Sequence, residues 1–160
     1  MLELLAPAGN LDAVIAAVQN GADAVYMGFG DGFNARRSAD NFTQESFAKA
    51  VRYCHIRGCK VYVTLNTLVG DREMDAAAAL AQQASDAGAD AILVQDLGLA
   101  RVLRAALPDI PLHASTQMSI HNLAGVEAAA EMGITRAVLA RELSLEQIRF
   151  ISQHASIETE

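Results

Sequence analysis

The sequence has few cysteines and few basic residues, and both shortages limit the functions it could serve. Two cysteines, Cys54 and Cys59, cannot build the disulfide framework of a small secreted domain, so we expect a cytoplasmic setting. The sequence has 12 lysine and arginine residues and 19 acidic residues, which gives a formal net charge of −7. Because phosphate contacts require lysine and arginine, this charge disfavours nucleic-acid binding by this stretch alone.

Targeting segments and long apolar runs are also lacking. Residues 1–5 carry no basic segment, and Pro7 and Gly9 follow closely. No apolar run is long enough to span a bilayer, so we expect neither a signal peptide nor a membrane partner. The remaining composition, 52% hydrophobic and 19% charged over 160 residues, is typical of a soluble domain with a sizeable core.

Several familiar catalytic motifs are absent as well. The sequence contains no nucleophile elbow, no paired-histidine zinc motif and no phosphate-binding loop. Cys54, His55 and Cys59 could suggest a metal site, but no second pair of ligands accompanies them. We therefore expect two buried free thiols and no bound metal.

Strand-like and helix-like segments alternate along the whole chain. The expected strands cover residues 2–6, 24–28, 60–66, 91–94, 112–115 and 137–140, and a seventh begins at Ile157. The expected helices cover residues 11–19, 43–57, 71–87, 97–107, 121–132 and 144–154. An internal echo supports this division, because residues 21–26 (GADAVY) match residues 88–93 (GADAIL).

Such alternation with short connections predicts parallel β/α units. Two architectures fit this pattern, the eight-stranded barrel and the open doubly wound sheet. We favour a TIM-barrel-like fold, because no Gly-x-Gly-x-x-Gly follows the first strand and polar strand ends recur all along the chain. A complete barrel takes roughly 250 residues. The sequence offers six strands and the start of a seventh, which predicts an incomplete barrel from the N-terminal part of a longer protein.

Polar side chains at the ends of the expected strands are the main functional signal. In a strand at residues 112–115, His113 and Ser115 would share one face, and Gln117 follows them. Because barrel enzymes place their chemistry at the C-terminal strand ends, we expect these groups to surround one mouth. The predicted catalytic residues are His113, Asp96 and Asn66, and the predicted substrate-binding residues are Ser115, Gln117, Arg141 and Glu142. The alternative is that some of them are buried pairs or helix caps.

The glycine-rich stretch 28–41 supplies one more candidate. Its glycines permit unusual backbone angles, and Arg36 could bind the oxygens of a carboxylate or phosphate in a substrate. The alternative is a solvated loop with no ligand.

Five ordered motifs resemble the collagenase-like peptidase U32 family, and they extend over essentially the whole chain. They are residues 3–9 (ELLAPAG), 21–26 (GADAVY), 63–67 (VTLNT), 113–117 (HASTQ) and 139–144 (LARELS). The resemblance implies that residues 1–160 are the N-terminal part of a single barrel-like domain. Residues 94–96 and 113–117 are most similar to the branch that hydroxylates a cytidine of large-subunit ribosomal RNA. Sister branches hydroxylate a transfer-RNA uridine or the ubiquinone ring.

The resemblance also implies a cofactor and partners. The family's hydroxylases are associated with an iron–sulfur cluster, and the RNA branches with prephenate, a small carboxylate. The family signature that leads to the cluster cysteines would begin at residues 157–160, and Cys54 and Cys59 do not correspond to those cysteines. We therefore expect no cofactor in this fragment, a cluster in the full-length protein, and no activity from the fragment alone.

Three functions remain open at this point. The first is hydroxylation of RNA by the full-length protein, which would bind RNA or a prephenate-like carboxylate. The second is a peptidase, as the family name implies, although no protease triad is recognisable in the sequence. The third is a barrel that binds a ligand or partner without catalysis.

Overall fold

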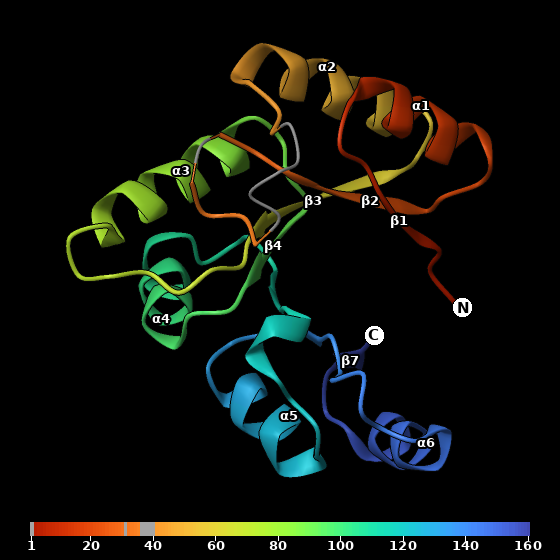
Figure 1. The fold of residues 1–160 in the computed structure, drawn as a ribbon, viewed down its shortest axis with the longest axis vertical. Coiled ribbons are helices and arrows are strands. Elements are labelled where there is room, and N and C mark those ends of the chain that lie inside the picture. The colour runs from red at the N-terminus through yellow and green to blue at the C-terminus, as the bar shows by residue number, and fades with distance from the viewer. Residues whose placement is uncertain (1, 31, 36–40) are drawn as a thin grey trace.

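The computed structural model describes residues 2–30, 32–35 and 41–160, which form one curled sheet with helices around it (Figure 1). Within those residues, seven strands alternate with six α-helices and one short 3₁₀-helix. The strands are β1 (Leu5–Pro7), β2 (Ala24–Gly28), β3 (Lys60–Leu65), β4 (Ala91–Val94), β5 (Leu112–Ala114), β6 (Arg136–Ala137) and β7 (Glu158–Thr159). The helices are α1 (Leu11–Gln19), α2 (Gln44–His55), α3 (Met74–Asp86), α4 (Leu97–Ala106), α5 (Leu123–Glu131) and α6 (Leu145–His154), and the 3₁₀-helix is η1 (Thr116–Met118).

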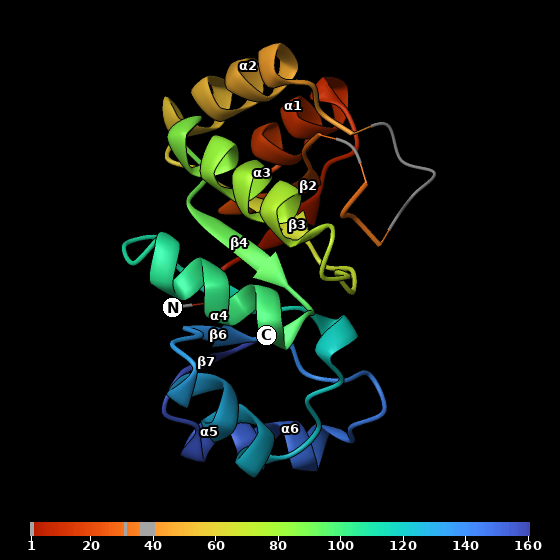
Figure 2. The ribbon, with the colours of Figure 1, turned by 90° about the vertical axis from the view of Figure 1, so that its left-hand side faces the viewer.

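The strand order shows which of the two predicted architectures the chain adopts. Every strand pairs in parallel with its neighbours in sequence, so the order in the sheet is β1-β2-β3-β4-β5-β6-β7. A doubly wound sheet would reverse its order at a switch point, whereas a barrel keeps the sequence order. Figure 2 shows the helices on the outer side of the curled sheet. The prediction of an incomplete TIM-barrel-like fold with six strands and the start of a seventh is confirmed.

Local sequence signals account for the helix boundaries. Asn10 begins α1, since its side chain accepts a hydrogen bond from the backbone of Ala13 at 2.9 Å. Ser144 and Gln147 form a reciprocal capping box at the start of α6. α3 begins later than the expected residue 71, because Gly70 and Glu73 form a turn first. None of the described helices has the length and apolar character needed to cross a membrane.

The hydrophobic core lies mainly between the helices and the convex side of the sheet. Phe47, Ile92 and Leu99 are fully buried there, and each such side chain contributes about 1.5–3 kcal/mol to folding. The concave side has a smaller cluster, in which Tyr62 packs among small residues such as Ala91. This arrangement leaves the concave side, the barrel interior, to carry the polar groups.

The similarity between residues 21–26 and residues 88–93 corresponds to a repeated hydrogen bond. Asp23 precedes β2 and accepts a bond from the backbone N–H of Leu4 at 2.7 Å. Asp90 precedes β4 and accepts the equivalent bond from Val61 at 2.7 Å. Each aspartate therefore ties the start of its strand to the preceding neighbour in the sheet.

Candidate functional site

A cavity of about 300 Å³ lies at the C-terminal ends of the strands. Its walls come from residues that follow β1, β2, β3, β5, β6 and β7, so the strand ends converge as the barrel fold requires. Its polar lining side chains are Asn34, Thr64, Asn66, Ser115, Thr116, Gln117, Arg141 and Glu160, with Tyr26 beside them.

Asn66 joins three strand ends at this cavity. It follows β3, and its Nδ2 donates a hydrogen bond to the Ser115 hydroxyl after β5 at 3.1 Å. Its Oδ1 accepts one from the backbone N–H of Ala35, in the stretch after β2, also at 3.1 Å. Ser115 Oγ in turn accepts a bond from the backbone of Gln117 at 3.3 Å, which starts the 3₁₀-helix. The structure therefore brings Asn66, Ser115 and Gln117 together, and their roles in catalysis and substrate binding stay predictions.

Arg141 is the basic side chain among the described residues of the cavity lining. It is exposed, and no described residue forms an ion pair or hydrogen bond with it. Its guanidinium is therefore available to an anionic ligand. Glu142, next to it, is exposed and is not among the described residues that line the cavity.

Asp96 acts on the backbone rather than facing the cavity. Its Oδ1 accepts a hydrogen bond from Leu99 at 2.8 Å and caps α4, and its Oδ2 accepts one from Val69 at 3.4 Å. One carboxylate oxygen thus positions the start of α4, and the other positions the loop before α3. This is the helix-cap alternative that the sequence left open, and a catalytic role for Asp96 stays a prediction that no contact in the structure supports.

His113 lies deeper in the barrel than the sequence suggested. It shares a strand face with Ser115 but precedes it by two residues, which is about 6–7 Å along a strand. It lines a second cavity at the opposite, N-terminal ends of the strands, with Lys60 and Arg136. Its ring is 5% exposed and meets the ring of Tyr62 edge-on, with 5.0 Å between centroids. The expected position at the mouth is therefore wrong for His113, and its catalytic role stays a prediction.

Burial and the nearby Arg136 charge lower the pKa of His113 to about 4. The imidazole is therefore neutral at physiological pH, and it offers one donor and one acceptor. Its Nδ1 atom is buried without a hydrogen-bond partner in the described part of the chain.

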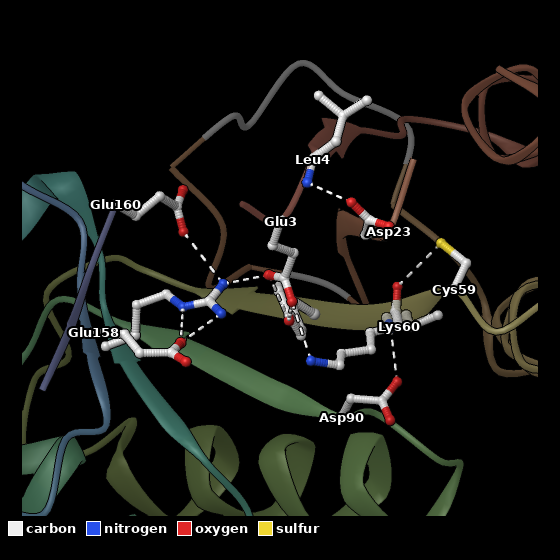
Figure 3. A network of polar contacts seen from close by, with 11 residues as sticks. Glu3, Leu4, Asp23, Cys59, Lys60, Asp90, Glu158 and Glu160 are labelled. Carbon is white, nitrogen blue, oxygen red and sulfur yellow. Dashed lines mark hydrogen bonds and ion pairs between the residues drawn. The ribbon is translucent and has the colours of Figure 1, made fainter. Parts of the chain in front are cut away.

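A network of charged groups links the residues before β1 with β3, β6 and β7 (Figure 3). Arg136 of β6 forms ion pairs with Glu3 at 2.5 Å and with Glu158 of β7 at 2.6 Å. Lys60 and Tyr62 also donate to Glu3, at 3.0 and 2.9 Å. Burial alone would raise the pKa of Glu3, but these hydrogen bonds outweigh it and lower that pKa to about 2. Glu3, before β1, is thereby held against strands at the far end of the sheet.

Two residues remain to be compared with the predictions from the sequence. One was predicted and the other was missed. Arg36 lies outside the described residues. Glu160 lines the cavity but was not among the expected site residues. It is a polar residue directly after a strand, which is the same signal that identified Asn66. The seventh strand was recognised only at its start, so that signal was missed.

The described residues do not fit an iron–sulfur cluster or a metal ion. Cys54 and Cys59 are both buried free thiols, and burial raises the pKa of Cys54 to about 12, so its thiol stays protonated. Within residues 2–30, 32–35 and 41–160, no group of three or more histidine, cysteine or acidic side chains could hold a metal. Cluster ligands would have to come from other residues.

Comparison with known proteins connects this geometry to a family. The model of the family described as peptidase family U32 matches residues 9–160. The chain belongs to peptidase family U32. A solved structure titled as the U32 peptidase Mk0906 superposes on this U32 chain with a TM-score of 0.79. The two share 17% identity over 99% of this chain and 67% of the other, which supports the barrel fold.

Two curated relatives are more similar in sequence to this U32 chain. The 23S rRNA 5-hydroxycytidine C2501 synthase of Escherichia coli is 43% identical over 95% of the chain and 22% of its own length. The tRNA hydroxylation protein P1 of Bacillus subtilis is 40% identical over 99% of the chain and 37% of its own length. This U32 chain therefore spans well under half the length of either relative.

Proposed function

We propose that this chain is the substrate-binding half-barrel of an RNA hydroxylation protein, and that the whole protein adds an oxygen atom to a pyrimidine of ribosomal or transfer RNA. The observation that carries the proposal is the cavity at the strand ends. Its lining includes Asn66, Ser115, Gln117 and Arg141. The names of the two relatives, which act on ribosomal and transfer RNA, support the choice of substrate.

The side chains of the cavity suit a nucleotide or a small carboxylate. The Arg141 guanidinium can donate two parallel hydrogen bonds to phosphate or carboxylate oxygens. The Gln117 side-chain amide carries donors and an acceptor, which complement the edge of a base. The Asn66 amide is bonded to Ser115 and Ala35 and holds the cavity wall in place. A prephenate-like carboxylate is a second ligand of the same chemistry, and Arg141 would hold it in the same way.

The acidic composition fits a division of labour in a longer protein. With a formal charge of −7, this chain does not supply the basic surface that binds an RNA backbone. We propose that other parts of the protein bind the RNA backbone and the iron–sulfur cluster, in the cytoplasm, while this chain binds the nucleotide to be modified.

Mass spectrometry of cellular RNA tests the proposal. The longest natural protein that contains this chain is expressed in bacteria whose own ribosomal and transfer-RNA hydroxylation genes are deleted. We expect a mass gain of one oxygen atom on a cytidine or uridine. Absence of that gain from every RNA, with the protein folded and its cluster loaded, would contradict the proposal.

Replacing Arg141 with alanine sharpens the same assay. Loss of a hydrogen bond to a charged group costs about 1.5–3 kcal/mol, so we expect hydroxylation to fall on the order of tenfold to a hundredfold. Arg149→Ala changes an exposed arginine of α6 and is the matched control, with hydroxylation unchanged. Equal activity of both variants would remove Arg141 from the site.

A peptidase is the second candidate, because the family description and the similar solved structure both carry that word. The described residues give it little support, since the buried Cys54 and Cys59 are protonated and His113 has no hydrogen-bonded nucleophile. Gelatin hydrolysis that is lost in His113→Ala would favour the peptidase. Binding of ligand with no reaction of either kind would favour a non-catalytic barrel.

A further inference from the structure

Three carboxylates converge on one guanidinium in the barrel interior, and they do not share it equally (Figure 3). Glu3 and Glu158 take the direct hydrogen bonds of Arg136, at 2.5 to 2.9 Å. Glu160 is left with a longer contact, 3.8 Å from Arg136 Nη1. The Lys60 ammonium forms an ion pair with Glu3 and not with Glu160. Glu160 is therefore the weakly compensated member of the cluster.

Glu160 differs from the other two acids in its position as well. It follows β7 and lines the cavity at the C-terminal strand ends, alongside Arg141 and Tyr26. Its backbone is fixed by β6 and the residues just after it, because its N–H donates to the Ala137 carbonyl at 2.9 Å and its carbonyl accepts from the Leu139 N–H at 2.8 Å. The carboxyl group is thus held on a strand end between the charge network and the ligand cavity.

The surroundings of Glu160 raise its pKa. Partial burial of this carboxyl, whose side chain is 34% exposed, raises the pKa, the Arg136 charge lowers it, and the negative Glu3 raises it further. From the cavity side, Arg141 and Tyr26 are the other charged or titratable groups that line the same space among the residues that the structure describes. A carboxyl group whose proton affinity is shifted toward neutral pH is suited to proton transfer.

We propose that Glu160 is the group that exchanges a proton with the substrate in this cavity, and that Arg136 is its positioning residue. The proposal rests on the proposed function, in which the cavity binds the nucleotide to be modified. A proton that leaves the substrate bonds to a carboxylate oxygen of Glu160 and then passes to solvent through the open mouth of the cavity. In the protonated form, the same carboxyl donates that proton to a basic atom of the substrate.

A titration of the longest natural protein that contains this chain tests the electrostatic part. Glutamate side chains labelled with ¹³C at the carboxyl carbon are followed by NMR from pH 3 to 9, and Glu160→Gln assigns the Glu160 signal. We expect Glu160 to titrate at higher pH than the exposed Glu146. Glu3→Gln should move the Glu160 midpoint downward, because Arg136 then has hydrogen bonds to give to Glu160. A Glu160 signal that titrates with Glu146 and ignores Glu3→Gln would overturn the proposal.

Activity of the longest natural protein tests the chemical part. Glu160→Gln keeps the shape of the side chain but can neither take up nor release a proton near neutral pH, and we expect hydroxylation to fall about 10²-fold or more, while binding of the nucleotide changes little. Glu146→Gln is the matched control on the exposed face of α6. Arg136→Lys should shift the pH profile, which a purely structural role would not do.

The outcomes separate the two proposals. Hydroxylation by wild type and equally by Glu160→Gln overturns the role of Glu160 and leaves the proposed function standing. No hydroxylation by wild type overturns the proposed function, and the NMR titration still decides whether Glu160 has the required proton affinity.

Discussion

At the scale of single residues, the depth of a side chain in the barrel decides what it can do. The side chains of His113, in β5, and Ser115, just after it, point to the same side of the chain. Their surroundings differ because Ser115 is two residues further along. Ser115 reaches the cavity at the strand ends, whereas His113 is enclosed beside Tyr62 and Arg136. A period of two identifies the face of a strand but not the height along it, so the sequence placed both residues at the mouth.

The buried His113 predicts a pH dependence of stability. Its pKa, about 4, is below the ordinary value of 6.5, so between these values the unfolded chain binds a proton that the folded chain excludes. The free energy of unfolding should therefore fall as pH decreases from about 6.5 to about 4. His113→Gln should reduce that fall, as measured by urea denaturation at pH 7 and pH 5. The exposed His121→Gln is the control, and an undiminished fall in His113→Gln would contradict the placement of His113.

At the scale of helices and strands, short local signals predicted most boundaries. Asn10 and Ser144 are residue types that commonly cap helices, and the structure shows both side chains capping. Asp96 was predicted to be a catalytic residue at a polar strand end, with a helix cap as the alternative, and it is the residue directly before α4. Asp96 fits two patterns, a polar strand end and a helix N-cap, and the sequence alone does not decide which role its carboxylate has.

Substitutions at Asp96 separate the cap from a catalytic role. Asparagine is as good an N-cap as aspartate, so in Asp96→Asn the amide oxygen should keep the bond from Leu99, and only the longer bond from Val69 is lost. If the proposed RNA hydroxylation does not use this carboxylate, Asp96→Asn should keep that activity and lose little stability. Asp96→Ala should lose about 1 kcal/mol of unfolding free energy, measured by urea denaturation. Full stability with abolished hydroxylation in Asp96→Asn would instead make this carboxylate part of the chemistry.

At the scale of the whole molecule, the alternation of strands and helices predicted the architecture, and long-range charge pairing escaped prediction. Strand order followed because short connections leave few alternatives to a parallel sheet in sequence order. Glu3 and Arg136 are 133 positions apart, and nothing local to either residue indicates that they meet. The same pairing leaves Glu160 weakly compensated at the cavity, and this depends on contacts between distant residues that no local pattern indicates.

The central claim is that the C-terminal strand ends of this half-barrel bind the nucleotide to be modified, and site-specific photo-crosslinking tests it most directly. A photoreactive phenylalanine analogue replaces Gln117 at the cavity in the longest natural protein, or the exposed Gln153 of α6 as the control. The account predicts that RNA crosslinks to position 117 and not to position 153. Equal crosslinking at both positions, or crosslinking at position 153 alone, would contradict it.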